Sequence, residues 1–170
     1  MKQIIIIISI LITTAAGAQV TKATLQAGGL TCAMCSKAVF KALSAVPFIE
    51  KVEPNIKLST YEIRFRQGSN VNLDALNKAV VDAGFSVAQL KITTHFNNAK
   101  VENDAHIKLD NQSYHFINVP AQVLNGEKTI SIIDKDFVTA KEYKKYEKLT
   151  AMKCYQSGEM NGQRVYHVTM

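Results

Sequence analysis

The sequence predicts an α+β fold: a four-stranded antiparallel sheet with two helices on one face, followed by a small β-rich region with one short helix. Two observations in residues 19–92 support the first part. Apolar residues alternate with polar ones in four short segments, and they recur at intervals of three and four residues in two others. The segments follow the order strand, helix, strand, strand, helix, strand, which is the order of a split βαβ unit.

A glycine pair separates the first strand from the first helix. Apolar and polar residues alternate over residues 23–27, and Gly28-Gly29 ends this strand. Residues 35–46 have apolar positions at helical spacing, and Pro47 ends the helix because proline has no amide hydrogen to donate. The sequence therefore predicts a tight connection directly before the first helix.

The remaining elements of the unit have equally clear boundaries. Residues 48–52 predict a second strand, and the alternation of apolar and charged residues over 61–65 predicts a third with one buried face. Asn72 is a favourable cap for the second helix, and Gly84 stands where glycine favours helix termination. Residues 85–92 predict the fourth strand.

Residues 1–18 have the pattern of a secretory signal peptide. Lys2 precedes an apolar run over residues 4–12, and the small residues 16–18 form a cleavage site that places the mature N-terminus at Gln19. The apolar run is shorter than the roughly 20 residues that span a bilayer. We expect an exported, soluble protein, periplasmic or secreted, that does not span the membrane after cleavage.

The polar residues 93–104 predict a linker, and residues 105–170 predict a small β-rich domain compatible with a partly open barrel. Thr139 and Glu142 have the spacing of a capping box, which predicts one short helix after them. The expected strands, the last two of which form a terminal hairpin, cover residues 106–110, 114–119, 128–134, 152–156 and 164–170.

Charge and composition restrict the function. The formal net charge is +6, and residues 19–92 carry nine Lys and Arg against five Asp and Glu. The basic residues are scattered and lack the interleaved aromatic residues of single-strand binders, so we expect no nucleic-acid partner. We also expect no enzymatic activity, because the sequence has no nucleophile elbow, phosphate-binding glycine loop or zinc-protease helix.

One motif carries recognisable chemistry, Cys32-Ala33-Met34-Cys35, at the start of the first helix. Thiolates are soft donors that suit Cu(I) and Hg(II), and a helix N-terminus favours the anionic form of a thiol. Two sulfurs do not complete the four-ligand shell of a structural zinc site. They satisfy an ion with near-linear coordination, whose open side admits a partner's ligand.

The run Gly29-Leu30-Thr31-Cys32-Ala33-Met34-Cys35 resembles the signature of heavy-metal-associated domains: glycine, methionine, threonine, cysteine, two residues of any kind, cysteine. This family includes copper chaperones, N-terminal modules of copper-transporting P-type ATPases and the periplasmic mercury-binding protein. The resemblance covers residues 22–92 and implies a ferredoxin-like βαββαβ fold.

The same resemblance implies that Cys32 and Cys35 are the metal ligands. The bound ion would be Cu(I) or another thiophilic ion, Hg(II), Zn(II) or Cd(II). Phe85 would lie near the loop, and Leu30, where the family usually has methionine, would pack beneath it as an apolar residue of similar volume. The implied partner of a monomeric carrier is a metal donor or acceptor, an efflux ATPase or a component of cuproenzyme assembly.

Other interpretations of these cysteines remain open at this point. An exported cysteine pair also suits a structural disulfide or a thiol-disulfide redox protein. A third alternative is an interaction module in which the C-terminal domain is the functional part. Met34 is not expected to act as a ligand, because residues between the cysteines usually face solvent.

A second soft site is conceivable near the C-terminus. Its candidate ligands lie on or beside the expected terminal hairpin: Cys154, Met152, Met160, His167 and Met170. The hairpin register decides whether their side chains share a face, and ordinary core packing is the favoured interpretation. His95, His106 and His115 are expected to be structural or surface residues.

Overall fold

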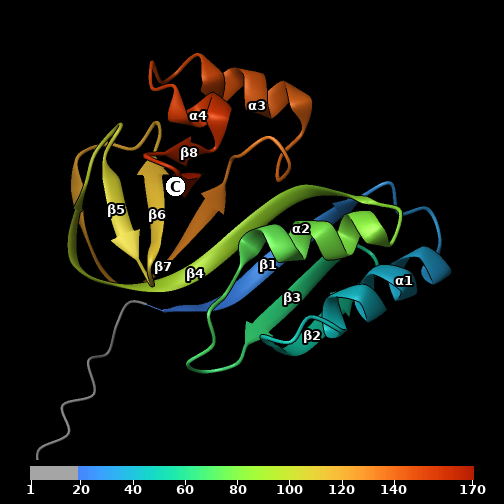
Figure 1. The fold of residues 1–170 in the computed structure, drawn as a ribbon. Coiled ribbons are helices and arrows are strands. Elements are labelled where there is room, and N and C mark those ends of the chain that lie inside the picture. The colour runs from blue at the N-terminus through green and yellow to red at the C-terminus, as the bar shows by residue number, and fades with distance from the viewer. Residues whose placement is uncertain (1–18) are drawn as a thin grey trace, which may run out of the picture.

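The structure, a computed structural model, describes residues 19–170 (Figure 1). The predicted signal peptide over residues 1–18 therefore lies outside the described residues. The N-terminal half contains β1 (Val20–Gly28), α1 (Ala33–Ser44), β2 (Ile49–Asn55), β3 (Thr60–Phe65), α2 (Leu73–Asp82) and β4 (Ser86–Val101). The C-terminal half contains β5 (His106–Leu109), β6 (Gln112–Phe116), β7 (Gln122–Ile132), α3 (Ala140–Glu147), α4 (Cys154–Ser157), β8 (Glu159–Met160) and β9 (Gln163–Thr169).

The strands of both halves join in one mixed sheet. Its order is β2-β3-β1-β4-β7-β9-β6-β5, with β8 paired to β9 beside this path. The β6 and β9 strands are parallel, whereas the other pairs are antiparallel. The sheet is not closed, so the C-terminal strands extend the first sheet instead of forming a partly open barrel of their own.

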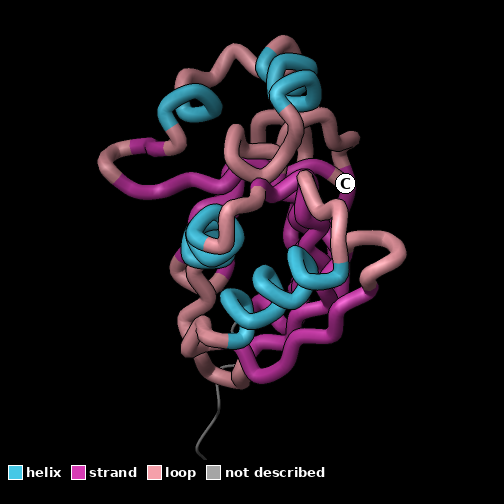
Figure 2. Tube along the Cα trace, turned by 90° about the vertical axis from the view of Figure 1, so that its right-hand side faces the viewer, coloured by secondary structure: helices cyan, strands magenta, loops and turns pink. Residues whose placement is uncertain are grey.

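The order β1-α1-β2-β3-α2-β4 confirms the predicted strand and helix sequence, and α1 and α2 lie together beside the β1–β3 end of the sheet (Figures 1 and 2). Asn72 caps α2 as expected, with its Oδ1 accepting a hydrogen bond from the amide of Ala75 at 3.3 Å. The helices bury Val39, Leu43, Leu76 and Val80 against the sheet.

The predicted linker is wrong over residues 93–101, because these residues continue β4 and pair with β7. The alternation of a strand is present although many of these side chains are polar: Thr94, Phe96 and Val101 are buried, whereas His95, Asn97 and Asn98 are exposed. A bulge between Phe96 and Ala99 shifts the register once. Polarity alone therefore failed to distinguish a half-buried strand from a linker.

The terminal hairpin also differs from the prediction. Residues 154–157 form the one-turn helix α4, and the hairpin consists of β8 and β9. Gly158 ends α4 with a φ of 72°, a left-handed conformation that glycine adopts readily, and its amide donates to the carbonyl of Cys154 at 2.8 Å. The capping box of Thr139 and Glu142 before α3 is confirmed.

Opposite faces of the C-terminal strands bury different residues. Tyr166 and Val168 of β9 belong to the main core, and His167 between them must face the other side because side chains alternate along a strand. Tyr155 of α4 packs on that second side in a smaller cluster with Ile117 and Ile133. In Figure 1, α3 and α4 accordingly lie apart from α1 and α2.

A polar contact links the C-terminal strands to α2. Arg164 of β9 donates from Nε and Nη2 to the two carboxylate oxygens of Asp74, at 3.0 and 3.1 Å. The hydroxyl of Tyr166 donates to the same carboxylate at 3.1 Å.

None of the helices within residues 19–170 has the length and apolar composition of a membrane span.

Candidate metal sites

The loop between β1 and α1 places the two motif cysteines at the surface. Gly29 leaves β1 with a φ of 80°, which L side chains rarely adopt. Cys32 is the N-cap of α1, and its Sγ accepts a hydrogen bond from the amide of Cys35 at 3.2 Å. This sulfur thus occupies the position where unpaired amides and the helix dipole favour negative charge.

Cys32 and Cys35 are joined as a disulfide, with their Cα atoms 5.2 Å apart. Cys32 is exposed and Cys35 is half-buried, so the outer side of the pair faces solvent. Met34 between them is 80% exposed, as expected for a residue that is not a ligand. The sulfurs are therefore close together and accessible.

Three contacts support this loop from below. Leu30 and Phe85 are half-buried and pack against the main core, as expected for both positions. A Cβ on Gly29 would lie 4.0 Å from the Phe85 ring, which places the ring beside the loop. The buried hydroxyl of Tyr61 on β3 donates to the carbonyl of Ser36 in the first turn of α1 at 3.1 Å.

Comparison with known protein families identifies the family of the domain that contains this loop. Residues 24–86 match the family model described as "Heavy-metal-associated domain", a span that includes both cysteines and the elements from β1 to the start of β4. Residues 24–86 are a heavy-metal-associated domain. The match does not extend into residues 87–170.

Solved structures similar to this chain each cover 39% to 41% of it. Oxidized MerP from Ralstonia metallidurans CH34 is 31% identical, covering 41% of this chain and 97% of its own, with a TM-score of 0.37. A copper binding domain from the P-type ATPase HMA7 is 27% identical, covering 39% of this chain and 89% of its own, with a TM-score of 0.36. The CopZ metallochaperone is 20% identical, covering 40% of this chain and 100% of its own, with a TM-score of 0.37. No curated protein matches the chain.

A second group of ligand-type side chains lies outside the heavy-metal-associated domain. The Sγ of Cys154 on α4 lies 3.7 Å from Nε2 of His106 on β5 and 3.6 Å from Nδ1 of His115 on β6. These three ligand atoms all lie within 4.8 Å of one another. The cluster arises because His106 and His115 are register partners on adjacent strands and α4 covers their face.

Carboxylates hold the histidines of this face in place. Nε2 of His115 lies 3.0 Å from Oδ1 of Asp104, which also accepts a hydrogen bond from the Thr150 hydroxyl at 2.6 Å. His167 is the register partner of His115 on β9, and its Nδ1 lies 2.6 Å from Oδ1 of Asp134. The remaining nitrogen of His167, Nε2, is buried and has no hydrogen-bond partner among residues 19–170.

Burial controls the ionisation of this cluster. Desolvation lowers the pKa of His115 to about 4, and the neighbouring His106 and His167 shift it in the same direction. Asp104 opposes this shift. Desolvation likewise lowers the pKa of His106 and raises the pKa of the Cys154 thiol. Both imidazoles are therefore neutral at neutral pH and have lone pairs to offer.

The structure separates the candidate ligands of the C-terminal soft site, and the favoured interpretation as core residues holds for Cys154 but not for the three methionines. Met152, Met160 and Met170 are exposed, and Cys154 contacts His106 and His115 instead. The expectation that these two histidines are ordinary structural or surface residues missed this contact. The only sequence signal was a histidine in each of the two strand segments, because α4, which supplies the sulfur, was predicted as a strand.

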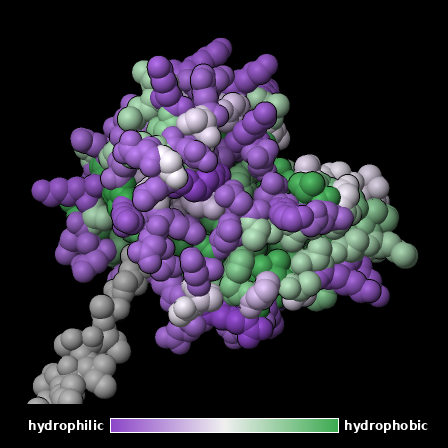
Figure 3. Space-filling model, in the orientation of Figure 1, coloured by the Kyte–Doolittle hydropathy of each residue, from purple (hydrophilic) through white to green (hydrophobic). Residues whose placement is uncertain are grey.

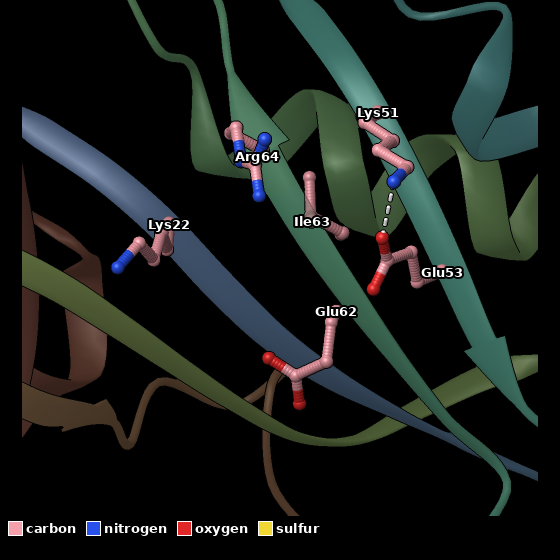
Figure 4. A pocket seen from close by; sticks show the side chains of 6 residues that line it. All are labelled: Lys22, Lys51, Glu53, Glu62, Ile63 and Arg64. Atoms are coloured by element: carbon pink, nitrogen blue, oxygen red, sulfur yellow. Dashed lines mark ion pairs between the residues drawn. The ribbon is translucent and has the colours of Figure 1, made fainter.

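Other surface features offer different chemistry. A shallow hollow crosses β1, β3 and β2 and is lined by charges of both signs, including the ion pair of Lys51 and Glu53 (Figure 4). Its lining contains no cysteine or histidine. In Figure 3 the surface around α3 is largely hydrophilic, whereas apolar residues gather at the end of the molecule where α1 and α2 lie.

Proposed function

We propose that the protein binds Cu(I), or another thiophilic ion such as Hg(II), between Cys32 and Cys35. The observation that carries this proposal is the pair of adjacent, accessible sulfurs at the N-terminus of α1 within a heavy-metal-associated domain. Two thiolates match the softness of Cu(I) and leave its coordination shell open. The similar domain of the P-type ATPase HMA7 is described as copper binding, so Cu(I) is the first ion to test.

The metal-binding form of the site is the dithiol. Reduction of the Cys32–Cys35 disulfide takes two electrons and two protons from a dithiol reductant and yields two thiols. Binding of Cu(I) then displaces the thiol protons, which are released to solvent. The disulfide form has no free thiolate, so oxidation of the pair switches metal binding off.

We further propose that the domain passes its ion to a partner by stepwise thiolate exchange. Cys32 is exposed and Met34 beside it is 80% exposed, so a partner's sulfur reaches the ion from the solvent side. Apolar surface at this end of the molecule provides a docking area for a metal donor or acceptor (Figure 3). Export to an extracytoplasmic compartment, based on the signal-peptide pattern, belongs to the same proposal.

A competitive Cu(I) titration of the reduced chain against a chromophoric chelator tests this function. The titration uses the Cys154→Ser background, which keeps both motif cysteines and removes the third thiol of the chain. We expect this variant to bind Cu(I) tightly. Adding Cys32→Ser and Cys35→Ser should weaken the binding by more than about 100-fold, because removing ligands costs more than the 10- to 100-fold effect of changing groups that only orient ligands. Unchanged affinity in this triple variant would refute the proposal.

Thiol-disulfide exchange is a second candidate function, favoured by the disulfide itself and by the exposure of Cys32. In this reaction the Cys32 thiolate attacks a substrate disulfide, and Cys35 resolves the mixed disulfide and releases the reduced substrate. Turnover of a disulfide substrate by the metal-free chain, with a dithiol reductant regenerating the Cys32 and Cys35 thiols and with activity lost in Cys32→Ser, would establish it. A metal-free chain that shows no turnover would dismiss it.

A further inference from the structure

The cluster of Cys154, His106 and His115 has the geometry of a metal site that is independent of the heavy-metal-associated domain. For a tetrahedral ion with bonds of about 2.3 Å to sulfur and about 2.05 Å to nitrogen, the sulfur-to-nitrogen edge is about 3.6 Å. The two distances from Cys154 Sγ to the imidazole nitrogens are 3.7 and 3.6 Å. The sulfur-to-nitrogen separations therefore already match those that one shared ion requires, and the three ligand atoms all lie within 4.8 Å of one another.

The surroundings of His115 match those of a ligand. One ring nitrogen faces Cys154, and the other faces the carboxylate of Asp104 at 3.0 Å. Histidines that bind metals almost always donate their other ring N–H to such a group, because this fixes the tautomer and orients the lone pair. The Thr150 hydroxyl, which donates to the same carboxylate, holds Asp104 in turn.

His167 adds a second, independent observation that points to a ligand. Its side chain is fully buried, Asp134 engages its Nδ1, and its Nε2 has no hydrogen-bond partner in the described part of the chain. A buried polar atom without a partner costs about 1 to 3 kcal/mol. Its ring centroid lies 5.2 Å from that of His115, so the imidazole of His167 lies on the same buried face.

A catalytic role explains these contacts less well. Cys154, His115 and Asp104 stand in the order of a nucleophile, a base and an orienting carboxylate. However, Cys154 is only 6% exposed, burial raises the pKa of its thiol, and a second imidazole occupies the space beside the sulfur. A substrate would have no access to this sulfur, whereas a single ion would contact all three side chains.

We propose that Cys154, His106 and His115 bind one zinc or copper ion, with the buried imidazole of His167 next to that of His115. Mixed thiolate and imidazole donors suit both ions. Asp104 acts as a positioning residue that orients His115. The C-terminal half of the chain is then a second metal-binding module and not only a support for the first.

The test uses the full chain with Cys32→Ser/Cys35→Ser, so that failure of the first site does not affect the result. Under reducing conditions, Co(II) serves as the spectroscopic probe, followed by competition with Zn(II) and with Cu(I). We expect one equivalent of Co(II) to give a thiolate-to-cobalt charge-transfer band. We expect Cys154→Ala to abolish the band, His106→Ala to weaken binding by more than about 100-fold, and Asp104→Asn to weaken it by about 10- to 100-fold.

The exposed His95 of β4 provides the matched control, and His95→Ala should bind Co(II) like its parent. A second readout guards against misfolded variants: Zn(II) should raise the Tm of the parent and of His95→Ala but not that of His106→Ala. The order of displacement of Co(II) identifies zinc or copper as the preferred ion. Absence of a charge-transfer band and of a Zn(II)-induced shift in Tm in the parent would overturn the proposal.

Discussion

At the scale of single residues, Gly29 determines how the chain enters the candidate metal loop. Its φ of 80° lies in the left-handed region, where a Cβ is unfavourable, and the ring of Phe85 lies beside it. Gly84 has a similar φ of 87° at the end of α2 but has no atom within 4 Å of the Cβ position. The two glycines therefore form a natural pair for comparison.

We predict that Gly29→Ala and Gly84→Ala each lower the free energy of unfolding by about 1 to 2 kcal/mol, because alanine is strained at positive φ. Only Gly29→Ala should also weaken Cu(I) binding, since it alone distorts the loop that holds Cys32. Urea unfolding and Cu(I) competition measure the two effects. Wild-type stability for both variants would contradict the assignment of backbone strain at these positions.

At the scale of elements, the short helix α4 depends on one aromatic side chain. Tyr155 is buried, stacks on Tyr143 with ring centroids 4.8 Å apart, and donates its hydroxyl to the carbonyl of Ile133 at 2.8 Å. A helix of four residues has too few internal hydrogen bonds to be stable alone. The tyrosine contacts therefore hold Cys154 over the histidine face.

We predict that Tyr155→Phe lowers the free energy of unfolding by about 1 to 2 kcal/mol, because it leaves the Ile133 carbonyl with one donor fewer. Tyr146→Phe is the control, since Tyr146 belongs to the same cluster only as a half-buried neighbour. Denaturant unfolding followed by far-ultraviolet circular dichroism gives both values. Equal stability of the Tyr155→Phe variant and the wild type would show that packing alone holds α4.

Sequence patterns predicted the elements of the N-terminal half because each has a local signal. The helix cap Asn72, the alternating 61–65 segment and Gly84 all act within a few residues of the chain. The C-terminal half was harder, because β7 is longer than its apolar residues indicate and α4 forms only through contacts with Ile133 and Tyr143. Long-range contacts of this kind leave no periodic pattern in the sequence.

The two candidate sites differ in the same way. Cys32 and Cys35 lie in one motif, so the sequence alone identifies them as candidate ligands. In the second site, Cys154 lies 48 residues after His106 and 39 residues after His115 along the chain. Only the pairing of β5 with β6 and the placement of α4 bring them together.

At the scale of the whole molecule, the continuous strand β4 and the Arg164–Asp74 pair couple the two halves. β4 pairs with β1 on one side and with β7 on the other. Arg164 and Asp74 form a bidentate contact, with side chains 33% and 48% exposed. Solvent screens this ion pair, so its contribution is smaller than that of a buried pair.

We predict a coupling free energy of about 1 kcal/mol for Arg164→Ala and Asp74→Ala in a double-mutant cycle, decreasing at high salt. The exposed pair of Lys78 and Asp82 within α2 is the control, with an expected coupling of about 0.3 to 0.5 kcal/mol. Unfolding of the single and double variants gives both values. A coupling no larger than that of the control would mean that the shared sheet alone joins the halves.

The central claim is that Cys32 and Cys35 together bind a soft ion in the reduced chain. X-ray absorption spectroscopy of the Cys154→Ser variant, loaded with one equivalent of Cu(I), tests it most directly, because the motif then provides the remaining thiols. We predict coordination by two sulfur atoms without imidazole nitrogen. A copper ion bound mainly by nitrogen would contradict the claim and move the primary metal site to the histidine face of the C-terminal half.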